Sequence, residues 1–359
     1  MMTSKERFKR MYEHKEADRV PIIDSPWAGT IRRWEAEGMP AGMDWCDFFD
    51  TDKTAAIGVD ITPRYGNDGK PGDKIVEETE KSLTLYTPWG VTMRYNKGED
   101  STPEFLDYKV VDQAAWDDCK RRMYEGEGRI DWDNLKNNYD RWVAEGRWIT
   151  AGFWFGFDVT HSWMMGTETL LIAMYEEPDM VMDMFHTYLN RCMELFGEIW
   201  DAGYKFDCIS WPDDMGYKGT TFFSNEMYRE LLGPVHKRAI DWAHERGIVA
   251  HMHSCGNVMT RVDDFVGMGL DALNPLEVKA GMKPIELKEK YGDKLVLHGG
   301  LNAVLWDDKE AIVEEIRRVV PVLKKNGGYI CSSDHSIPNS VSLDNFRTIV
   351  EEMKRCGSY

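Results

Sequence analysis

Short apolar runs of strand length alternate with segments of helical period along most of this chain. In the C-terminal half, residues 247–253, 294–298 and 329–332 have the length and composition of buried strands, and amphipathic stretches follow each of them. Such alternation is typical of parallel βαβ units, because a parallel strand pair needs a long crossover that a helix usually supplies. The chain therefore predicts an α/β fold built on a parallel sheet.

Eight strands are expected along the whole chain. They span residues 19–24, 56–61, 148–152, 206–211, 247–253, 270–273, 294–298 and 329–332. Helices are expected over residues 112–141, 225–246, 257–268, 284–291, 309–325 and 343–355. Eight βα units in order predict a (β/α)8 TIM barrel. No flexible linker divides residues 1–359, so we expect one domain.

One stretch interrupts the βα alternation. Residues 74–95 alternate at period two, and a turn signal lies at Pro88 to Gly90. This pattern predicts a β-hairpin inserted after the second barrel strand, at about residues 70–97.

The charge and the cysteines limit the class of protein. The net charge is −18, which argues against a nucleic-acid or anionic-membrane partner. Seven cysteines are scattered through a large chain, which is typical of a reducing compartment and not of a disulfide framework. No run reaches the ~20 apolar residues that span a bilayer. We expect a cytoplasmic protein, and the sequence leaves its oligomeric state open, a homodimer included.

Reactive side chains follow the expected strands at the ends where a TIM barrel carries its active site. They are Asp60 after the second strand, Asp213 and Asp214 after the fourth, His253 and Cys255 at the end of the fifth, Glu277 after the sixth, His298 at the end of the seventh, and Cys331, Asp334 and His335 at the end of the eighth. Their concentration at one rim of the barrel predicts a single active site.

The segment HMHSCGNV, residues 251–258, indicates a metal site. His253 and Cys255 are two residues apart and share one face of a strand, and Cys331 is expected to reach them across the barrel mouth. Zinc prefers thiolate and imidazole ligands, and catalytic sites use three protein ligands with one open position. We expect His253, Cys255 and Cys331 to bind zinc, with Glu277 as a possible fourth ligand. Either cysteine taken alone is more often a buried thiol.

Other polar residues near these ends suggest acid–base chemistry. Adjacent carboxylates disfavour simultaneous ionisation, so Asp213 or Asp214 is a candidate acid, with Tyr217 in the same loop. A solvated loop that caps the next helix explains this pair equally well. Asp334 and His335 are expected to form an acid–base pair or to orient a metal ligand.

Several residues are candidates for binding a substrate. Trp154, Trp163 and Trp211 lie after strands and are expected to line the barrel mouth, unless they belong to the core. Asp60 and His298 are further substrate-binding candidates. The abundance of aromatic side chains favours a methoxylated aromatic substrate or a similar small ether, as in an O-demethylase.

The sequence around these residues resembles the uroporphyrinogen decarboxylase superfamily over nearly the whole chain. The likeness rests on DDMG (213–216), YRELLGP (228–234), HSCGN (253–257), LNPLE (273–277), GGLN (299–302) and DHSIP (334–338). The resemblance implies a (β/α)8 barrel and one of two activities. One branch decarboxylates a porphyrinogen without a cofactor, and the other contains zinc-dependent methyltransferases that work with a corrinoid protein.

Two features favour the methyltransferase branch. That branch uses His-x-Cys followed far downstream by a second cysteine, which His253, Cys255 and Cys331 match. The decarboxylase branch uses an Arg-rich motif near the N-terminus, and residues 25–34 depart from it. Asp60, however, lies in a segment similar to the catalytic aspartate segment of the decarboxylase.

The resemblance therefore implies a zinc-dependent methyltransferase that moves a methyl group between a small methylated substrate and the cobalt of a corrinoid (cobalamin) carried by a partner protein. Three different functions stay open on the sequence alone. One is a methylcobalamin:thiol methyltransferase of the same branch. The second is a cofactor-free decarboxylase that uses Asp60, and the third is a non-catalytic corrinoid- or porphyrinoid-binding protein with a structural zinc.

Overall fold

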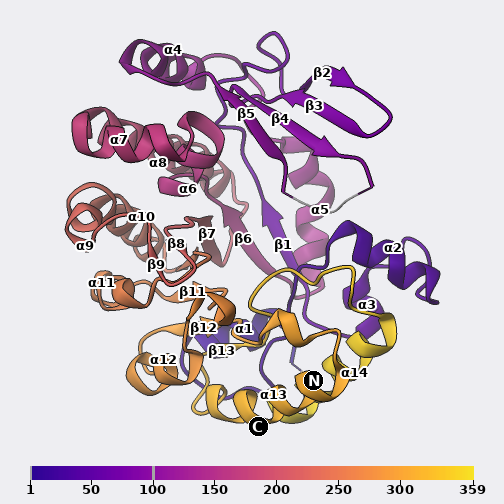
Figure 1. The fold of residues 1–359 in the computed structure, drawn as a ribbon. Coiled ribbons are helices and arrows are strands. Elements are labelled where there is room, and N and C mark those ends of the chain that lie inside the picture. The colour runs from indigo at the N-terminus through magenta and orange to yellow at the C-terminus, as the bar shows by residue number, and fades with distance from the viewer. Residues whose placement is uncertain (1, 99–101) are drawn as a thin grey trace.

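A parallel sheet of seven strands forms the centre of the molecule (Figure 1). The computed structural model describes residues 2–98 and 102–359. The seven strands are, in their order across the sheet, β1 (Thr54–Ile57), β6 (Trp148–Gly152), β7 (Cys208–Pro212), β10 (Val249–His253), β11 (Ala272–Asn274), β12 (Val296–His298) and β13 (Tyr329–Ile330). Every neighbouring pair is parallel, as the βα alternation predicts.

The first expected strand, residues 19–24, is not a regular strand in the structure. Ile22 instead forms a single parallel bridge with Cys331 after β13, and the Ile22 carbonyl accepts a hydrogen bond from the Asp52 amide, just before β1. This segment therefore links the two edge strands of the seven-stranded sheet. Seven of the eight expected barrel strands are therefore present as strands. At the place of the eighth, residues 19–24 contact the two edges of the sheet through Ile22.

The insertion after the first strand of the sheet is larger than the hairpin predicted from the sequence. It is an antiparallel sheet in the order β2 (Lys74–Glu78), β3 (Ser82–Tyr86), β4 (Val91–Asn96) and β5 (Glu104–Tyr108). β3 and β4 flank the expected turn, where Gly90 has φ +89°. In Figure 1 this sheet lies at the top of the molecule, apart from the seven-stranded sheet.

Helices surround the central sheet. They are α1 (Ser4–Tyr12), α2 (Ala28–Ala36), α3 (Trp45–Phe49), α4 (Gln113–Tyr124), α5 (Trp132–Ala144), α6 (Phe157–Thr160), α7 (Thr167–Glu176), α8 (Pro178–Asp201), α9 (Asn225–Met227), α10 (Gly233–Glu245), α11 (Val262–Met268), α12 (Pro284–Tyr291), α13 (Lys309–Leu323) and α14 (Leu343–Gly357). Residues 112–141 form two helices instead of one, because the chain between α4 and α5 turns at Gly126 and Gly128, which both have positive φ. Asp112 and Asp131 cap the two helices.

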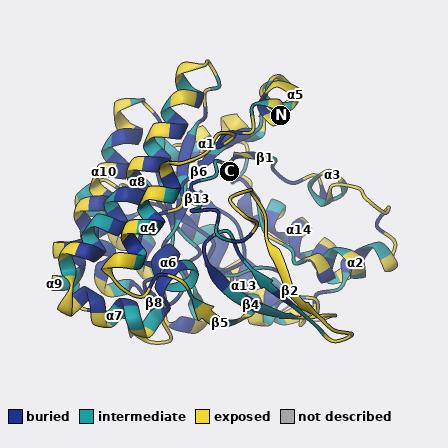
Figure 2. Cartoon of the chain, turned by 90° about the horizontal axis from the view of Figure 1, so that it is seen from above, coloured by how far each residue is buried: buried dark blue, intermediate teal, exposed yellow. Residues whose placement is uncertain are grey.

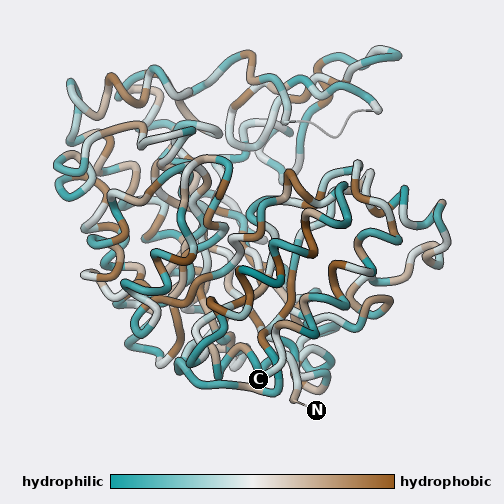
Figure 3. The backbone as a smooth tube through the Cα atoms, turned by 60° about the horizontal axis from the view of Figure 1, so that its bottom comes forward, coloured by the Kyte–Doolittle hydropathy of each residue, from teal (hydrophilic) through white to brown (hydrophobic). Residues whose placement is uncertain are grey.

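Burial follows this layering. Figure 2 shows the helices with a buried side and an exposed side, whereas β2 is exposed along its whole length. In Figure 3 hydrophobic stretches gather within the body of the molecule, and peripheral turns are mainly hydrophilic. Among the described residues, none of the helices has both the length and the apolar composition needed to cross a membrane.

Candidate functional site

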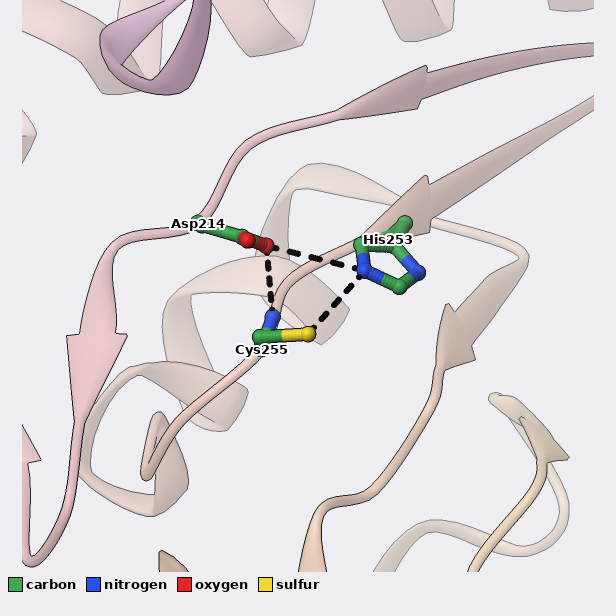
Figure 4. Close-up of side chains that lie close together, drawn as sticks. All are labelled: Asp214, His253 and Cys255. Atoms are coloured by element: carbon green, nitrogen blue, oxygen red, sulfur yellow. Dashed lines mark hydrogen bonds and ion pairs between the residues drawn. The ribbon is translucent and has the colours of Figure 1, made fainter. Parts of the chain in front are cut away.

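Asp214, His253 and Cys255 form a cluster of three potential metal ligands (Figure 4). His253 ends β10, Cys255 follows it by two residues, and Asp214 comes from the loop after the neighbouring strand β7. His253 Nε2 lies 3.2 Å from Cys255 Sγ and 3.6 Å from Asp214 Oδ1. One donor atom from each residue lies within 4.8 Å of the others. Zinc–ligand bonds of about 2.0–2.3 Å allow such atoms to share one ion.

The orientation of the His253 ring suits metal binding. Its Nδ1 lies 2.6 Å from Asn274 Oδ1, and the Asn274 amide nitrogen donates to the His298 carbonyl at 3.4 Å. Because Asn274 presents its oxygen to the ring, we assign the proton of His253 to Nδ1. Nε2 is then unprotonated and directed at Cys255. Metal-binding histidines are commonly oriented in this way by a hydrogen bond from the other ring nitrogen.

The backbone around Cys255 is tightly fixed. Its amide donates to Asp214 Oδ1 at 2.7 Å, and the Gly256 amide donates to Glu277 Oε2 at 2.7 Å. Gly256 has φ +77°, and a Cβ there would meet the Gly216 backbone at 2.1 Å, so a larger residue does not fit. The two loops that carry Asp214 and Cys255 are therefore packed directly against each other.

The Cys255 side chain is unsuited to act alone as a nucleophile. Burial raises the pKa of its thiol, and the carboxylates of Asp214 and Glu277 raise it further. The thiol therefore stays protonated at neutral pH unless a cation stabilises the thiolate. The donor set of imidazole, sulfur and carboxylate fits zinc.

The cluster opens into a cavity of about 350 Å³. The cavity is lined by Ile23, Asp24, Ser25, Asp214, His253, Cys255, Asn274, Pro275, His298, Ser332, Ser333, His335 and Ser336. Of the residues predicted from the sequence, this set brings together Asp214, His253, Cys255, His298 and His335. The cavity lies where strands β7, β10, β11, β12 and β13 end, as expected for the active site of a TIM barrel.

The cluster does not include Cys331, the third zinc ligand predicted from the sequence. Cys331 is fully buried, burial raises the pKa of its thiol to about 12, and the residue does not line the cavity. The third potential ligand in the cluster is Asp214. Glu277, the predicted fourth ligand, accepts from the Gly256 amide and does not line the cavity.

Two of the predicted catalytic carboxylates are buried in the framework. Asp213 is fully buried, and it accepts hydrogen bonds from the Asp158 amide at 2.8 Å and from His236 Nε2 at 2.7 Å. Asp334, also fully buried, accepts from the amides of Val278 and Ala303. Both carboxylates thus bond to segments far from them in the chain, and neither lines the cavity.

Asp60 lies away from the cluster. It lines a separate cavity of about 590 Å³ and pairs with Arg64 at 2.7 Å and Arg129 at 3.5 Å. Burial tends to raise the pKa of its carboxyl group, but hydrogen bonds from Thr62 and Arg64 outweigh burial and lower it.

The tryptophans predicted to line the barrel mouth, and Tyr217, also lie away from the cavity at the cluster. Trp211 is 1% exposed and packs against Phe155, while Trp154 and Trp163 contact each other with ring centroids 6.1 Å apart. Tyr217 is 47% exposed and packs against Phe222. None of these four predicted residues lines the cavity at the cluster.

His298 connects the cavity to the interior of the barrel. Its Nδ1 lies 3.3 Å from His251 Nε2, and His251 Nδ1 lies 3.1 Å from the Tyr12 hydroxyl. Burial lowers the pKa of His251 to about 3 and that of His298 well below its ordinary value. Both rings are therefore neutral at neutral pH. His251 lies between His298 and Tyr12 and does not line the cavity.

The sequence motifs and this arrangement agree with the comparison to known families, in which the model of uroporphyrinogen decarboxylase (URO-D) matches residues 3–356. The chain belongs to the uroporphyrinogen decarboxylase family. A solved methyltransferase from Methanosarcina mazei has a similar fold, with a TM-score of 0.62, 14% identity and 99% of each chain covered. A B12-independent methionine synthase from Shewanella has a TM-score of 0.40 at 12% identity, covering 80% of this chain and 73% of its own. The search of curated proteins gave no match.

Sequence reasoning missed several residues of this family member's cavity. Asp24, Ser25, Asn274, Ser332, Ser333 and Ser336 line it but were not predicted. Asp24 ends the first expected strand and Asn274 ends β11, so the strand-end rule applied to every polar residue would have found both. The serines carry no comparable signal, because serine is common in loops of every kind.

Proposed function

We propose that this protein is a zinc-dependent methyltransferase that moves a methyl group between a small methylated substrate and the cobalt of a corrinoid protein. The observation that carries the proposal is the Asp214–His253–Cys255 cluster in the wall of a cavity of about 350 Å³. Family membership adds to it, because the family contains methyltransferases with His-x-Cys metal ligands. The corrinoid is supplied by a partner protein.

Asp214, His253 and Cys255 would hold the zinc ion, and His335, which lines the same cavity, offers a further nitrogen donor. When bound, zinc supplies a Lewis acid that activates the substrate atom next to the methyl group, or lowers the pKa of a thiol substrate. These two uses correspond to demethylation of the substrate and to methylation of a thiol.

The residues around the cluster prepare it for either use. Asn274 holds the proton of His253 on Nδ1, which leaves Nε2 free to bind a metal. The Cys255 amide orients the Asp214 carboxylate, and the neutral ring of His298 can hold a hydrogen bond to a substrate in the cavity. Side chains locked in this way lose little entropy when a ligand binds.

A decarboxylase and a non-catalytic tetrapyrrole-binding protein fit the cavity less well. Decarboxylation would depend on Asp60, which faces a different cavity and is neutralised by Arg64. A volume of about 350 Å³ is at the small end of ligand sites, which span roughly 300–1,000 Å³. That volume favours a small substrate over a tetrapyrrole. A purely structural zinc would have a closed ligand shell, whereas this cluster opens to the cavity.

The test combines metal analysis with a methyl-transfer assay. The purified chain is expected to contain one zinc ion, and to change the visible spectrum of a reduced corrinoid protein when the right methylated substrate is present. His253→Ala should lose zinc and lower the rate by more than about 100-fold. His244→Ala, on the surface of α10, is the matched control and should keep both. A zinc-free wild-type protein, or full activity in His253→Ala, contradicts the proposal.

A further inference from the structure

The cavity at the cluster carries the carboxylates of Asp24 and Asp214, and among the described residues that line it there is no lysine or arginine. The His298 ring is neutral at neutral pH, because burial disfavours its charged form. The chain as a whole has a net charge of −18, which adds to the negative potential at the cavity.

Asp24 is oriented entirely by neutral donors. Its Oδ1 accepts from the Ser25 amide at 2.8 Å and from the Ser333 hydroxyl at 2.7 Å, and its Oδ2 accepts from the Ser333 amide at 2.8 Å. These bonds fix the direction of the carboxyl group without neutralising it. Asp24 lies beside β13, three strands along the sheet from His253 of β10. The charge and the metal cluster therefore approach the cavity from different sides.

Zinc in the cluster would leave this charge in place. A divalent ion bound by one thiolate, one carboxylate and one neutral imidazole has no net charge. The carboxylate of Glu277 does not change the sum for the cavity, because Glu277 does not line it. Asp24 thus supplies the uncompensated charge that a ligand meets.

The rest of the lining combines serines with the apolar side chains of Ile23 and Pro275. Four serines contribute to it, namely Ser25, Ser332, Ser333 and Ser336. The tryptophans expected to line the mouth lie elsewhere: Trp211 is 1% exposed, and Trp154 packs against Trp163. Among the described residues that line the cavity there is no phenylalanine, tyrosine or tryptophan on which a methoxylated aromatic ring could stack, and histidine supplies the ring side chains there.

We propose that the cavity takes a small methylated ammonium compound, with Asp24 as the counter-charge to its quaternary nitrogen. This inference rests on the methyltransferase function proposed above and names its substrate class. Transfer of the methyl group as CH₃⁺ to the nucleophilic acceptor breaks the C–N bond and leaves its electron pair on nitrogen. The product leaves the transfer step as an uncharged tertiary amine, which takes up a proton from water at neutral pH. The charge of Asp24 therefore selects the substrate for binding.

The test compares two ligands of the same shape. Choline and 3,3-dimethylbutan-1-ol differ in one atom and one positive charge, and their binding to the zinc-loaded protein is measured by calorimetry without a corrinoid protein. Choline is expected to bind at least about tenfold more tightly. Equal binding of the two, or no binding of choline, overturns the inference. This comparison uses the wild-type protein and does not depend on any variant.

Variants identify the carboxylate that gives choline its preference over the uncharged analogue. Asp24→Asn should reduce the preference for choline to less than about threefold, and Asp24→Glu should restore most of it. Asp60→Asn, which removes a carboxylate from the other cavity, is the matched control and should keep the full preference. Thermal unfolding of each variant identifies a loss of fold. A full preference in folded Asp24→Asn assigns the charge to another group and overturns the role of Asp24.

The experiments distinguish a failure of the proposed ligand binding from a failure of the proposed methyl transfer. If choline binds selectively but no methylated substrate changes the corrinoid spectrum, the proposed enzymatic function is wrong while the cation-binding cavity stands. If the protein demethylates methoxybenzenes and shows no preference for choline, the function stands and the ammonium substrate is wrong.

Discussion

A cysteine follows each of the strands β10 and β13, but among the described residues only the one after β10 joins the cluster of potential metal ligands. From the end of β10 onward, burial alternates residue by residue: His251, His253, Cys255 and Asn257 are partly exposed, and the residues between them are buried. After β13, Cys331 is fully buried and does not line the cavity, while the two serines that follow it do. A cysteine at a strand end is therefore a ligand candidate only when its parity directs it into the barrel.

The strongest test of this difference makes the same substitution at the cysteine after β10 and at the cysteine after β13. Cys255→Ser should lose zinc and more than about 100-fold of the methyl-transfer rate, because the thiolate ligand is removed. Cys331→Ser should keep its zinc, since Cys331 neither belongs to the cluster nor lines the cavity. Metal analysis of both purified variants checks the prediction. If Cys331→Ser lost zinc and Asp214→Asn kept it, the proposed ligand set would be wrong.

The second prediction concerns the group that orients His253. Asn274→Ala removes the acceptor for Nδ1–H, so zinc affinity should fall about 10–100-fold, as is usual when such a bond is lost. The matched change at the other strand end is Ser332→Ala, which removes a cavity hydroxyl that bonds to the Ser333 carbonyl. It should leave zinc affinity unchanged. Competition with a zinc chelator measures both, and equal affinities for the two variants would contradict the prediction.

The third prediction uses pH to compare two carboxylates. Burial raises the pKa of Asp24 to about 6 from an ordinary 3.8. The protonated carboxyl group therefore contributes fully to the stability of the fold at low pH, and this contribution is lost as pH rises through 6. Replacing Asp24 with Asn removes this loss. The stability of Asp24→Asn relative to wild type should therefore improve by about 1–3 kcal/mol between pH 4 and pH 7.

Asp60 should behave in the opposite way. Hydrogen bonds from Thr62 and Arg64 lower the pKa of its carboxyl group, so the ionised form stabilises the fold above the ordinary pKa, and this contribution is lost as pH falls through the lowered value. Asp60→Asn should thus be more destabilising at pH 7 than at pH 3. Urea unfolding at each pH measures both variants. Parallel pH profiles for the two would contradict the assignment.

The smallest expected effect is on the unfolding free energy, where replacing Cys331 should cost more than replacing Cys255. In the zinc-free protein, Cys331→Ala removes a fully buried sulfur and should cost about 1 kcal/mol of unfolding free energy. Cys255→Ala removes a side chain that borders the cavity and should cost less than about 0.5 kcal/mol. Chemical unfolding after removal of metal checks this. A larger cost at Cys255 would mean that its thiol packs in the core.

The two aspartates after β7 show the same principle within a single loop. Asp213 is fully buried and bonded to His236, while Asp214 joins His253 and Cys255. Their sequence indicates a carboxylate pair but does not say which member faces the cavity. Neighbouring residues in an extended segment point to opposite sides, so only the packing of the loop against β10 assigns the two roles.

Much of the protein was determined by the sequence alone. The βα alternation predicted the parallel sheet and its strand order, because apolar period and turn residues are local properties of the chain. The parity of residues 253 and 255 predicted that His253 and Cys255 share a face, and both line the cavity. The motifs from DDMG to DHSIP predicted the family.

Tertiary structure decided the rest of the site. Asp214 reaches the cluster because the Asp213 amide bonds to the His253 carbonyl and the Cys255 amide bonds to Asp214, contacts between loops about 40 residues apart. That Cys331 does not line the cavity could not be predicted, because β13 is only Tyr329–Ile330, too short for a period to be read from the sequence. The segment that carries Asp24 is no regular strand, and its place beside β13 depends on contacts with residues more than 300 positions away. Local patterns predict which face a side chain takes, but the packing of distant loops selects its partners.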